Sequence, residues 1–292
     1  MKYLFDPATP SVAIVAQELR FPVNRIYCVG RNYAAHAREM GGAPERESPF
    51  FYSKPANAVT DNGVTLPFPS RTQDLHHEVE LVVALSGEDL AAKGQDLNLI
   101  EAKAAIYGYG VGIDFTRRDL QAEAKDKARP WDTAKGFDNS APVSALTPAA
   151  QAGGIDSANI SLLVNGEIRQ QGMISDLIWS IPELIAELST YYRLRPGDLI
   201  FTGTPAGVSA VLPGDVMEGR IDNLETLKID TRRVKTSPAR IERRSRARLQ
   251  VARCPNFQHQ SHRFRCHVPQ AIVLLLLLRR REHYVGEIAV LT

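Results

Sequence analysis

The sequence predicts a strand-rich α+β fold, and three observations support this prediction. Short apolar segments of strand length recur along the chain, segments with a helical apolar period are few, and the two kinds do not alternate regularly. A doubly wound parallel sheet requires such alternation. The 292 residues are also enough to bury a full core. We therefore expect a mixed, mainly β architecture.

In the N-terminal half, strands are predicted from apolar and aromatic runs that end at Gly, Pro or Asn-Gly turn signals. We expect them within the leader of residues 1–18 and at residues 24–29, 50–52, 76–85 and 105–113. Helices are expected at residues 33–40, within residues 91–104 and at residues 116–127.

The C-terminal half is predicted to contain short strands and one amphipathic helix. The helix covers residues 181–192, where apolar residues recur at helical spacing and Pro182 suits the first turn. The strands are expected at residues 160–164, 167–170, 199–202 and 215–221.

The net charge of +2 conceals two segments of opposite charge. Residues 1–230 contain 21 Lys and Arg against 30 Asp and Glu, whereas residues 231–292 contain 14 Lys and Arg against 3 Glu. In the second segment Arg largely replaces Lys, and the pattern of strands and turns ends. We therefore expect one folded domain over residues 1–230 and a basic, Arg-rich tail over residues 231–292. The composition of the tail indicates disorder or out-of-frame translation of a GC-rich gene end.

The tail also contains residue types that suggest other functions. Cys254, His259, His262 and Cys266 could bind zinc, but their spacing matches no established ligand pattern. Its basic residues could form a nucleic-acid-binding arm, yet few aromatic residues accompany them and the acidic domain would oppose binding. We expect neither a zinc site nor a nucleic-acid partner.

Three features bear on the cellular compartment. The N-terminus lacks a basic stretch followed by an apolar run, so we expect no signal peptide. The apolar run at residues 271–278 is shorter than the roughly 20 residues that span a bilayer. Three cysteines are too few for a disulfide framework. We therefore expect a cytoplasmic protein without a membrane partner.

Carboxylates form the first candidate site. Glu78 and Glu80 are two residues apart in a predicted strand, so both point to one face with Cα atoms about 7 Å apart. A cation between them would relieve their repulsion, and Mg²⁺ or Mn²⁺ prefers oxygen ligands. Asp114, which ends another predicted strand, is a third candidate ligand. The two glutamates could also be solvated on an exposed face, and Asp114 could be a helix N-cap.

Other polar residues could act beside these carboxylates. His36 and Glu39 are three residues apart on a predicted helix, so Glu39 could orient the imidazole to accept a proton from water. The same spacing also suits a plain surface pair. Lys135, near aromatic residues, could stabilise an anion or extend over a ring. Thr204 lies in a turn whose hydroxyl and N–H groups could hold a carboxylate, or which could be only a turn.

Seven segments occur in a fixed order over about 190 residues: CVGRNYAAHAREM (28–40), PFFYSKPANAV (49–59), HHEVELVV (76–83), GVGIDFTRRDLQ (110–121), PWDTAKGFD (130–138), VNGEIRQ (164–170) and PGDLIFTGTPAGV (196–208). In this order they resemble the fumarylacetoacetate hydrolase family, from about residue 21 to residue 229. The first segment is most similar to the bacterial fumarylpyruvate hydrolases and acylpyruvases of that family.

The resemblance implies a mixed β-sandwich roll, a homodimer and a catalytic domain over residues 1–230. It also implies a Mg²⁺ or Mn²⁺ cofactor held by Glu78, Glu80 and Asp114. The pair of His36 and Glu39 would activate water from a segment that closes on the substrate. The remaining implied contacts to substrate oxygens come from Lys135, Arg31, Gln121 and Thr204.

The residues and the resemblance imply the same reaction on a small 2-oxo acid. In a 2,4-dioxo acid such as fumarylpyruvate, water would attack the C4 carbonyl and the C3–C4 bond would break, releasing pyruvate. Decarboxylation of oxaloacetate and isomerisation of an unsaturated 2-oxo diacid need the same enolate stabilisation. The chain could instead be a nucleic-acid-binding protein that acts through its basic tail, or an inactive relative of these enzymes.

Overall fold

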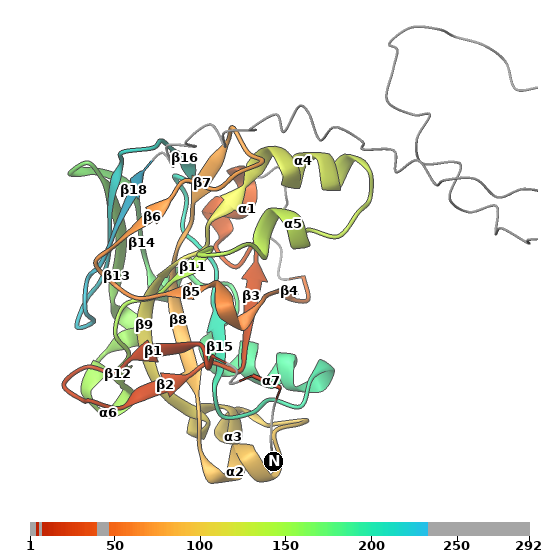
Figure 1. Cartoon of the computed structure of the whole chain (residues 1–292). Coiled ribbons are helices and arrows are strands. Elements are labelled where there is room, and N and C mark those ends of the chain that lie inside the picture. Colours follow the sequence, from red (N-terminus) through yellow and green to blue (C-terminus); the bar gives the residue numbers. More distant parts are fainter. Residues whose placement is uncertain (1–3, 6–7, 40–46, 233–292) are drawn as a thin grey trace, which may run out of the picture. The chain divides into compact units, whose positions relative to one another are not determined.

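The computed structural model describes residues 4–5, 8–39 and 47–232 (Figure 1). Its largest sheet has six strands in the order β12 (Thr147–Pro148), β9 (Ile106–Ile113), β8 (Val79–Leu85), β15 (Asp198–Phe201), β3 (Arg25–Gly30) and β4 (Phe50–Lys54). Of the pairings in this sheet, only that of β15 with β3 is parallel. All seven residues of β8 are buried, because this strand lies inside the sheet and is covered on both faces.

A five-stranded sheet lies beside β8 and β9 (Figure 1). Its order is β14 (Glu167–Met173), β13 (Asn159–Val164), β17 (Val216–Ile221), β18 (Leu227–Arg232) and β6 (Val64–Pro67). The two sheets approach closely at Gly219, where a Cβ atom would lie 2.9 Å from Val111 and 3.3 Å from Val79. Apolar residues of both sheets form one core cluster. The predicted strand-rich α+β sandwich is therefore confirmed.

Smaller sheets and seven α-helices complete the described residues. The three-stranded sheet has the order β10 (Thr116–Arg117), β7 (Leu75–His77) and β16 (Ser209–Val211). Two-stranded pairs join β1 (Ser11–Ala13) to β2 (Arg20–Pro22) and β5 (Val59–Thr60) to β11 (Ala141–Pro142). The helices are α1 (Ala34–Glu39), α2 (Glu88–Ala92), α3 (Leu99–Ala104), α4 (Arg118–Asp126), α5 (Asp132–Lys135), α6 (Ala149–Ala152) and α7 (Ile181–Tyr191). Among the described residues, no helix is long and apolar enough to cross a membrane.

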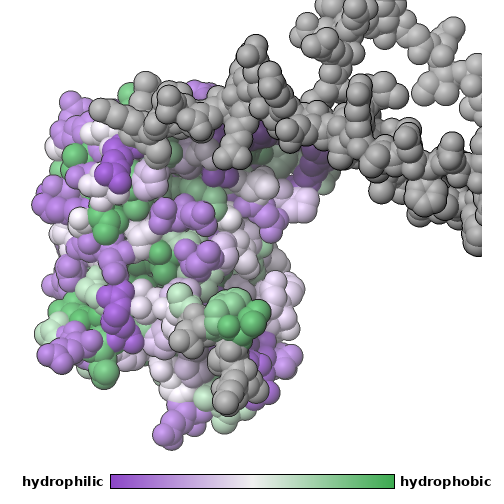
Figure 2. Space-filling model, viewed as in Figure 1, coloured by the Kyte–Doolittle hydropathy of each residue, from purple (hydrophilic) through white to green (hydrophobic). Residues whose placement is uncertain are grey.

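The surface of the described part is mixed in polarity. Figure 2 shows hydrophilic and hydrophobic residues interspersed over the visible face, with hydrophilic ones in the majority. Such a surface is ordinary for a globular domain whose apolar residues lie mainly in its core.

Helix α7 shows how local sequence determines an element. The Glu183 carboxylate accepts the Ser180 N–H at 3.0 Å, and Pro182 occupies the first turn. Its buried residues recur at helical spacing and face the core, namely Ile181, Leu184, Ile185, Leu188 and Ser189.

Two predicted elements differ from those in the structure. The strand expected at residues 76–85 is interrupted at Glu78, because β7 pairs in the three-stranded sheet whereas β8 pairs in the six-stranded one. The helix expected at residues 116–127 begins only at Arg118, because Thr116 and Arg117 pair with β7. The helix expected within residues 91–104 is confirmed as α3, and α2 is an additional helix that begins at Glu88.

Some strands were not expected from the sequence, among them β2, β6, β16 and β18. The last of these continues to Arg232, two residues past the expected end of the domain, and pairs in parallel with β6. The expectations for the tail, including disorder, out-of-frame translation and the rejected zinc site, lie outside the described residues.

Candidate metal centre and active site

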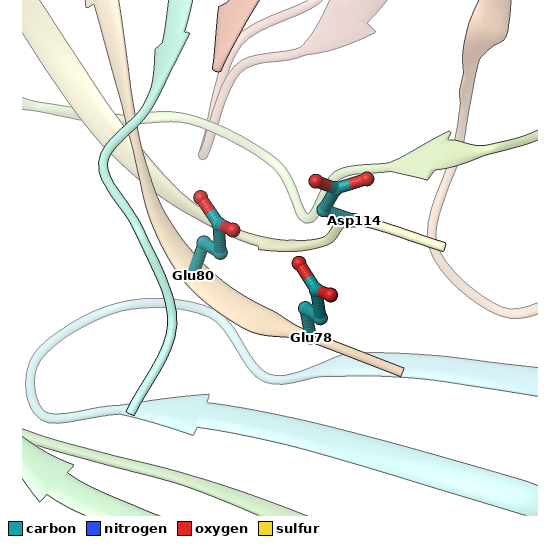
Figure 3. A group of neighbouring side chains, drawn as sticks. All are labelled: Glu78, Glu80 and Asp114. Atoms are coloured by element: carbon teal, nitrogen blue, oxygen red, sulfur yellow. The ribbon is translucent and has the colours of Figure 1, made fainter. Parts of the chain in front are cut away.

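Three buried carboxylates converge at one end of the neighbouring strands β8 and β9 (Figure 3). Glu78 lies at the interruption between β7 and β8, Glu80 lies within β8, and Asp114 directly follows β9. The Asp114 N–H donates to the Glu78 carbonyl at 2.8 Å, which ties the two strand ends together. One oxygen of each carboxylate lies within 4.8 Å of the others, and the residues are 5%, 1% and 0% exposed.

Three cations contact two of these carboxylates. Lys135 Nζ lies 2.8 Å from Glu78 Oε2 and 2.7 Å from Asp114 Oδ2. The Arg118 guanidinium lies 2.6 Å from Glu78 Oε1, and Lys54 Nζ lies 2.8 Å from Asp114 Oδ1. Lys54 and Arg118 were not identified from the sequence. A lysine at the end of the aromatic run of strand β4 was the available signal for Lys54.

Glu80 differs from its neighbours because no ion pair with a cation is found for it among the described residues. Its Oε2 accepts the Gly203 N–H at 2.7 Å. Burial, then the charges of Asp114 and Glu78, raise the pKa of Glu80 well above its usual value. Burial alone would raise the pKa of Glu78 too, but Lys135 and Arg118 outweigh it and lower that pKa.

This donor set fits a hard divalent cation. Three neighbouring carboxylates offer oxygen ligands. A buried carboxylate is stabilised by a paired cation, and Glu80 has none among the described residues. Mg²⁺ and Mn²⁺ prefer such oxygen ligands and keep positions free for water or substrate. The geometry of Glu78, Glu80 and Asp114 therefore suits the expected divalent metal.

His36 and Glu39 lie on α1 at the edge of the same cavity. His36 Nδ1 is 3.5 Å from Glu39 Oε2, so the contact is long. The Gly207 N–H lies 3.2 and 3.3 Å from the two Glu39 oxygens and donates to that carboxylate. Burial lowers the pKa of His36, although Glu78 and Glu39 act in the opposite direction. A neutral imidazole at neutral pH can accept a proton.

The cavity holds about 430 Å³ of space, part of it open to solvent. Seven of the nine expected site residues line it, namely Arg31, His36, Glu78, Glu80, Gln121, Lys135 and Thr204. The other two, Glu39 and Asp114, contact residues of this lining. The structure thus brings the whole expected set together.

Aromatic residues form a wall of the cavity that was not expected from the sequence. Phe50 and Trp131 meet edge to face with centroids 5.1 Å apart, and Tyr52 lies 6.0 Å from the same indole. The Tyr52 hydroxyl donates to Asp114 Oδ2. Lys125 Nζ lies 5.2 Å from the centre of the Trp131 ring. The aromatic run in β4 was the sequence signal for this wall.

Two further cations line the cavity, Arg31 and Lys125. Within the described part of the chain neither has an ion pair with a carboxylate. Burial lowers the pKa of Lys125, and the neighbouring charges of Arg118 and Arg31 lower it further. The cavity therefore presents uncompensated positive charge in addition to its acidic triad.

Two packed sheets with a buried carboxylate triad and a histidine beside it define a class of enzymes that act at a bound divalent metal. The profile of the fumarylacetoacetate (FAA) hydrolase C-terminal family matches residues 25–231, so the chain belongs to this family. The resemblance inferred from the seven sequence segments is thereby confirmed.

Relatives in the family carry different activities in their names. The chain is 43% identical over 205 residues to oxaloacetate tautomerase YcgM of Escherichia coli (strain K12), covering 70% of this chain and 91% of that protein. It is 41% identical over 183 residues to a fumarylpyruvate hydrolase of Ralstonia sp, covering 63% of this chain and 92% of that protein.

A solved structure supports both the fold and the fumarylpyruvate hydrolase resemblance. It is the fumarylpyruvate hydrolase from Pseudomonas aeruginosa in complex with Mn²⁺ and pyruvate, with a TM-score of 0.75 and 49% sequence identity. The match covers 80% of this chain and 100% of that one.

Proposed function

We propose that the protein is a divalent-metal-dependent hydrolase that cleaves a C–C bond in a 2,4-dioxo acid, fumarylpyruvate or a related acylpyruvate. The products are a carboxylic acid and pyruvate. The observation that carries this proposal is a buried histidine, contacted by a glutamate, in the same cavity as a carboxylate triad. The similarity to a hydrolase solved with Mn²⁺ and pyruvate supports it.

Glu78, Glu80 and Asp114 are the residues that would hold Mg²⁺ or Mn²⁺. When bound, the metal supplies Lewis-acid polarisation of the substrate oxygens and neutralises negative charge that develops in the reaction. The ion pairs of Lys135, Arg118 and Lys54 keep two of the ligands charged and oriented.

The chain supplies the acid–base chemistry through His36. Its neutral imidazole takes a proton from water while the hydroxide adds to the C4 carbonyl carbon, and Glu39 stabilises the resulting imidazolium. Breaking the C3–C4 bond gives the carboxylic acid and leaves the bond electrons on the enolate of pyruvate. Lys135 provides positive charge for this enolate, and the imidazolium returns its proton to C3.

The lining favours a substrate with a second negative charge. Arg31 and Lys125 lack carboxylate partners among the described residues. A carboxylate at the far end of the substrate would form ion pairs with them. A fumaryl group carries such a carboxylate, whereas a simple acyl group does not. Gln121 and Thr204 are proposed to hydrogen-bond the remaining substrate oxygens.

A second candidate is an oxaloacetate tautomerase or decarboxylase, or an isomerase of an unsaturated 2-oxo diacid. The 43% identity to an oxaloacetate tautomerase favours it. These reactions also pass through an enolate and act on a diacid, so the triad, Lys135 and the cations of Arg31 and Lys125 serve them equally well. They do not need an activated water, and His36 would then transfer a proton to or from carbon.

The deciding experiment measures pyruvate and fumarate release from fumarylpyruvate with and without Mg²⁺ or Mn²⁺, beside oxaloacetate. Metal-dependent release of the two products in equal amounts is expected. Pyruvate from oxaloacetate alone would reassign the protein as a decarboxylase. A change in the enol absorbance of oxaloacetate without pyruvate would reassign it as a tautomerase.

We also propose that the protein is a cytoplasmic homodimer of aromatic catabolism. The support is the similarity to bacterial fumarylpyruvate hydrolases, together with the unsaturated diacid skeleton of fumarylpyruvate, which opening of an aromatic ring can supply. Light scattering after size-exclusion chromatography should give twice the chain mass of 32.3 kDa.

A further inference from the structure

Gln170 is a buried amide outside the cavity lining, on the edge strand β14. It is 1% exposed, whereas the other residues of β14 are exposed or half-buried. A buried amide is unfavourable unless its donors and acceptors find partners. The partners of Gln170 all belong to segments that carry site residues.

The amide oxygen of Gln170 accepts hydrogen bonds from the residues on either side of Glu78. Gln170 Oε1 accepts the Val79 N–H at 3.1 Å, and this backbone donor fixes which end of the amide is oxygen. His77 Nδ1 lies 2.9 Å from the same oxygen and must therefore donate its proton to it. His77 Nε2 is then left to accept the Ser209 hydroxyl at 2.9 Å. His77 and Val79 are the two neighbours of Glu78.

The amide nitrogen of Gln170 donates hydrogen bonds to the segment of residues 203–207. Gln170 Nε2 donates to Thr204 Oγ1 and to the Pro205 carbonyl, both at 2.8 Å. Both donors and both acceptor positions of the amide are thus used. Gln170 joins the strand of Glu78 to the segment of Thr204, which is 34 residues away from it in the sequence.

Residues 203–207 contact the site at three points. The Gly203 N–H donates to Glu80, the Gly207 N–H donates to Glu39, and Thr204 lines the cavity. A shift of this segment would therefore move a proposed ligand, the partner of His36 and a proposed substrate contact together.

A β-bulge aims Gln170 at this segment. In the pairing of β13 with β14, Leu162 pairs with Gln170 but Leu163 pairs with Ile168, so Arg169 is an extra residue. A bulge changes the side to which the following side chain points. The segment lies directly on the bulge, because a Cβ atom at Gly207 would be 2.1 Å from the Arg169 carbonyl oxygen.

We infer that Gln170 is a positioning residue, which holds residues 203–207 at a fixed place relative to the carboxylates of Glu78 and Glu80. It touches neither substrate nor metal and acts through Thr204, Glu80 and Glu39. The effect on turnover rests on the proposed function, whereas the effect on the position of the segment does not.

The first test compares amide hydrogen exchange in two variants. Gln170→Met keeps the length of the side chain but removes all four hydrogen bonds. Gln171→Met is the matched control, because Gln171 follows on the same strand and is exposed. We expect at least tenfold faster exchange in residues 203–207 for Gln170→Met, and unchanged exchange for the control. Equal exchange in both variants would overturn the inference.

The second test measures coupling to Thr204 with the substrate that the wild-type protein turns over. We expect Gln170→Met to lower kcat/KM at least tenfold, but less than threefold when Thr204→Val is already present. Unchanged kcat/KM, or fully additive losses, would reduce Gln170 to a purely structural role and contradict the inference. If Gln170→Met does not fold, Gln170→Glu replaces it, since the carboxylate keeps the acceptor for Val79 and loses both donors.

The two tests separate the inference from the proposed function. A wild-type protein without turnover of fumarylpyruvate would refute that function, while the exchange rates would still decide whether Gln170 positions the segment.

Discussion

Glu78 and Glu80 are chemically identical and two residues apart, yet their surroundings place their pKa values on opposite sides of the usual value. Lys135 and Arg118 lie against Glu78, whereas Glu80 faces other carboxylates and a single backbone N–H. Without a metal, Glu80 therefore binds a proton more readily than Glu78 does. A divalent cation beside Glu80 would stabilise the charged carboxylate and therefore lower its pKa again.

Metal binding should consequently release protons. We expect release of up to about one proton per Mn²⁺ as the pH falls through the raised pKa of Glu80, and a Mn²⁺ affinity that rises up to about tenfold per pH unit below that pKa. Calorimetry in buffers of different ionisation enthalpy measures this number. Glu80→Gln should abolish both the proton release and most of the affinity. Binding of Mn²⁺ without proton release at any pH would contradict the raised pKa of Glu80.

His36 should determine the acid limb of the pH profile. Because burial lowers its pKa below 6.5, kcat/KM should stay constant at neutral pH and fall as the pH decreases through that lower pKa. Glu39 raises this pKa, so Glu39→Gln should move the limb to lower pH and also reduce kcat. His36→Asn should lower kcat by about 10²–10⁴-fold and remove the limb. An acid limb that survives in His36→Asn would exclude His36 as the base.

At the scale of elements, the site depends on where strands end rather than on any one strand. The chain leaves the three-stranded sheet at Glu78 and enters the six-stranded sheet at Val79, and β9 ends just before Asp114. Residues 203–207, which follow β15, contact the same site through Gly203, Thr204 and Gly207. Glu78 and Asp114 lie opposite each other because the Asp114 N–H donates to the Glu78 carbonyl, which continues the pairing of β8 with β9 by one residue.

Gly207 should be the least replaceable residue of this segment. Its φ is +93°, and a Cβ atom would meet the Arg169 carbonyl oxygen at 2.1 Å. Gly207→Ala should lower the free energy of unfolding by at least about 1–3 kcal/mol. It should also reduce kcat, because the backbone shift that relieves the clash moves the N–H at this position away from Glu39. Urea unfolding measures the first effect, and steady-state kinetics measure the second.

Gly214→Ala is the matched control for this substitution. Its φ of +107° imposes a similar backbone strain, but no atom lies within 4 Å of the added Cβ. The stability difference between the two variants therefore measures the close contact alone. Equal losses would show that the contact with Arg169 is relieved at little cost.

At the scale of the whole molecule, one core cluster joins the two large sheets, and the carboxylates of the site lie at one end of β8 and β9. The family match ends at residue 231 and β18 ends at Arg232. The strand β18 lies between β17 and β6 and contributes the buried Leu227 and Ile229 to the core. The strand β18 is therefore an integral part of the folded unit that carries the site.

A chain that ends at Arg232 should retain the unfolding midpoint and the metal-dependent turnover of the full chain. The reason is that every contact of the site described above lies before that residue. Thermal unfolding and kinetics of both chains check this. Loss of stability or activity on truncation would show that residues 233–292 belong to the catalytic domain.

The sequence was sufficient for the class of fold and for the set of candidate residues. Alternation in a strand places Glu78 and Glu80 on one face, and helical spacing places Glu39 near His36, since both rules act over two to four residues. The order of the seven segments added Arg31 and Gln121. The break at Glu78 escaped prediction because it depends on pairing with β10 and β16, which are distant in the sequence.

The sequence by itself determined which chemical groups are available, because strand alternation, helical spacing and segment order are local or linear properties of the chain. Only the tertiary structure decided what each group does. Glu80 meets Gly203 across 123 positions and Gln170 meets Val79 across 91. Protonation, ion pairing and the use of a buried amide depend on such distant partners, since burial makes a charge or a hydrogen bond depend on its nearest neighbours.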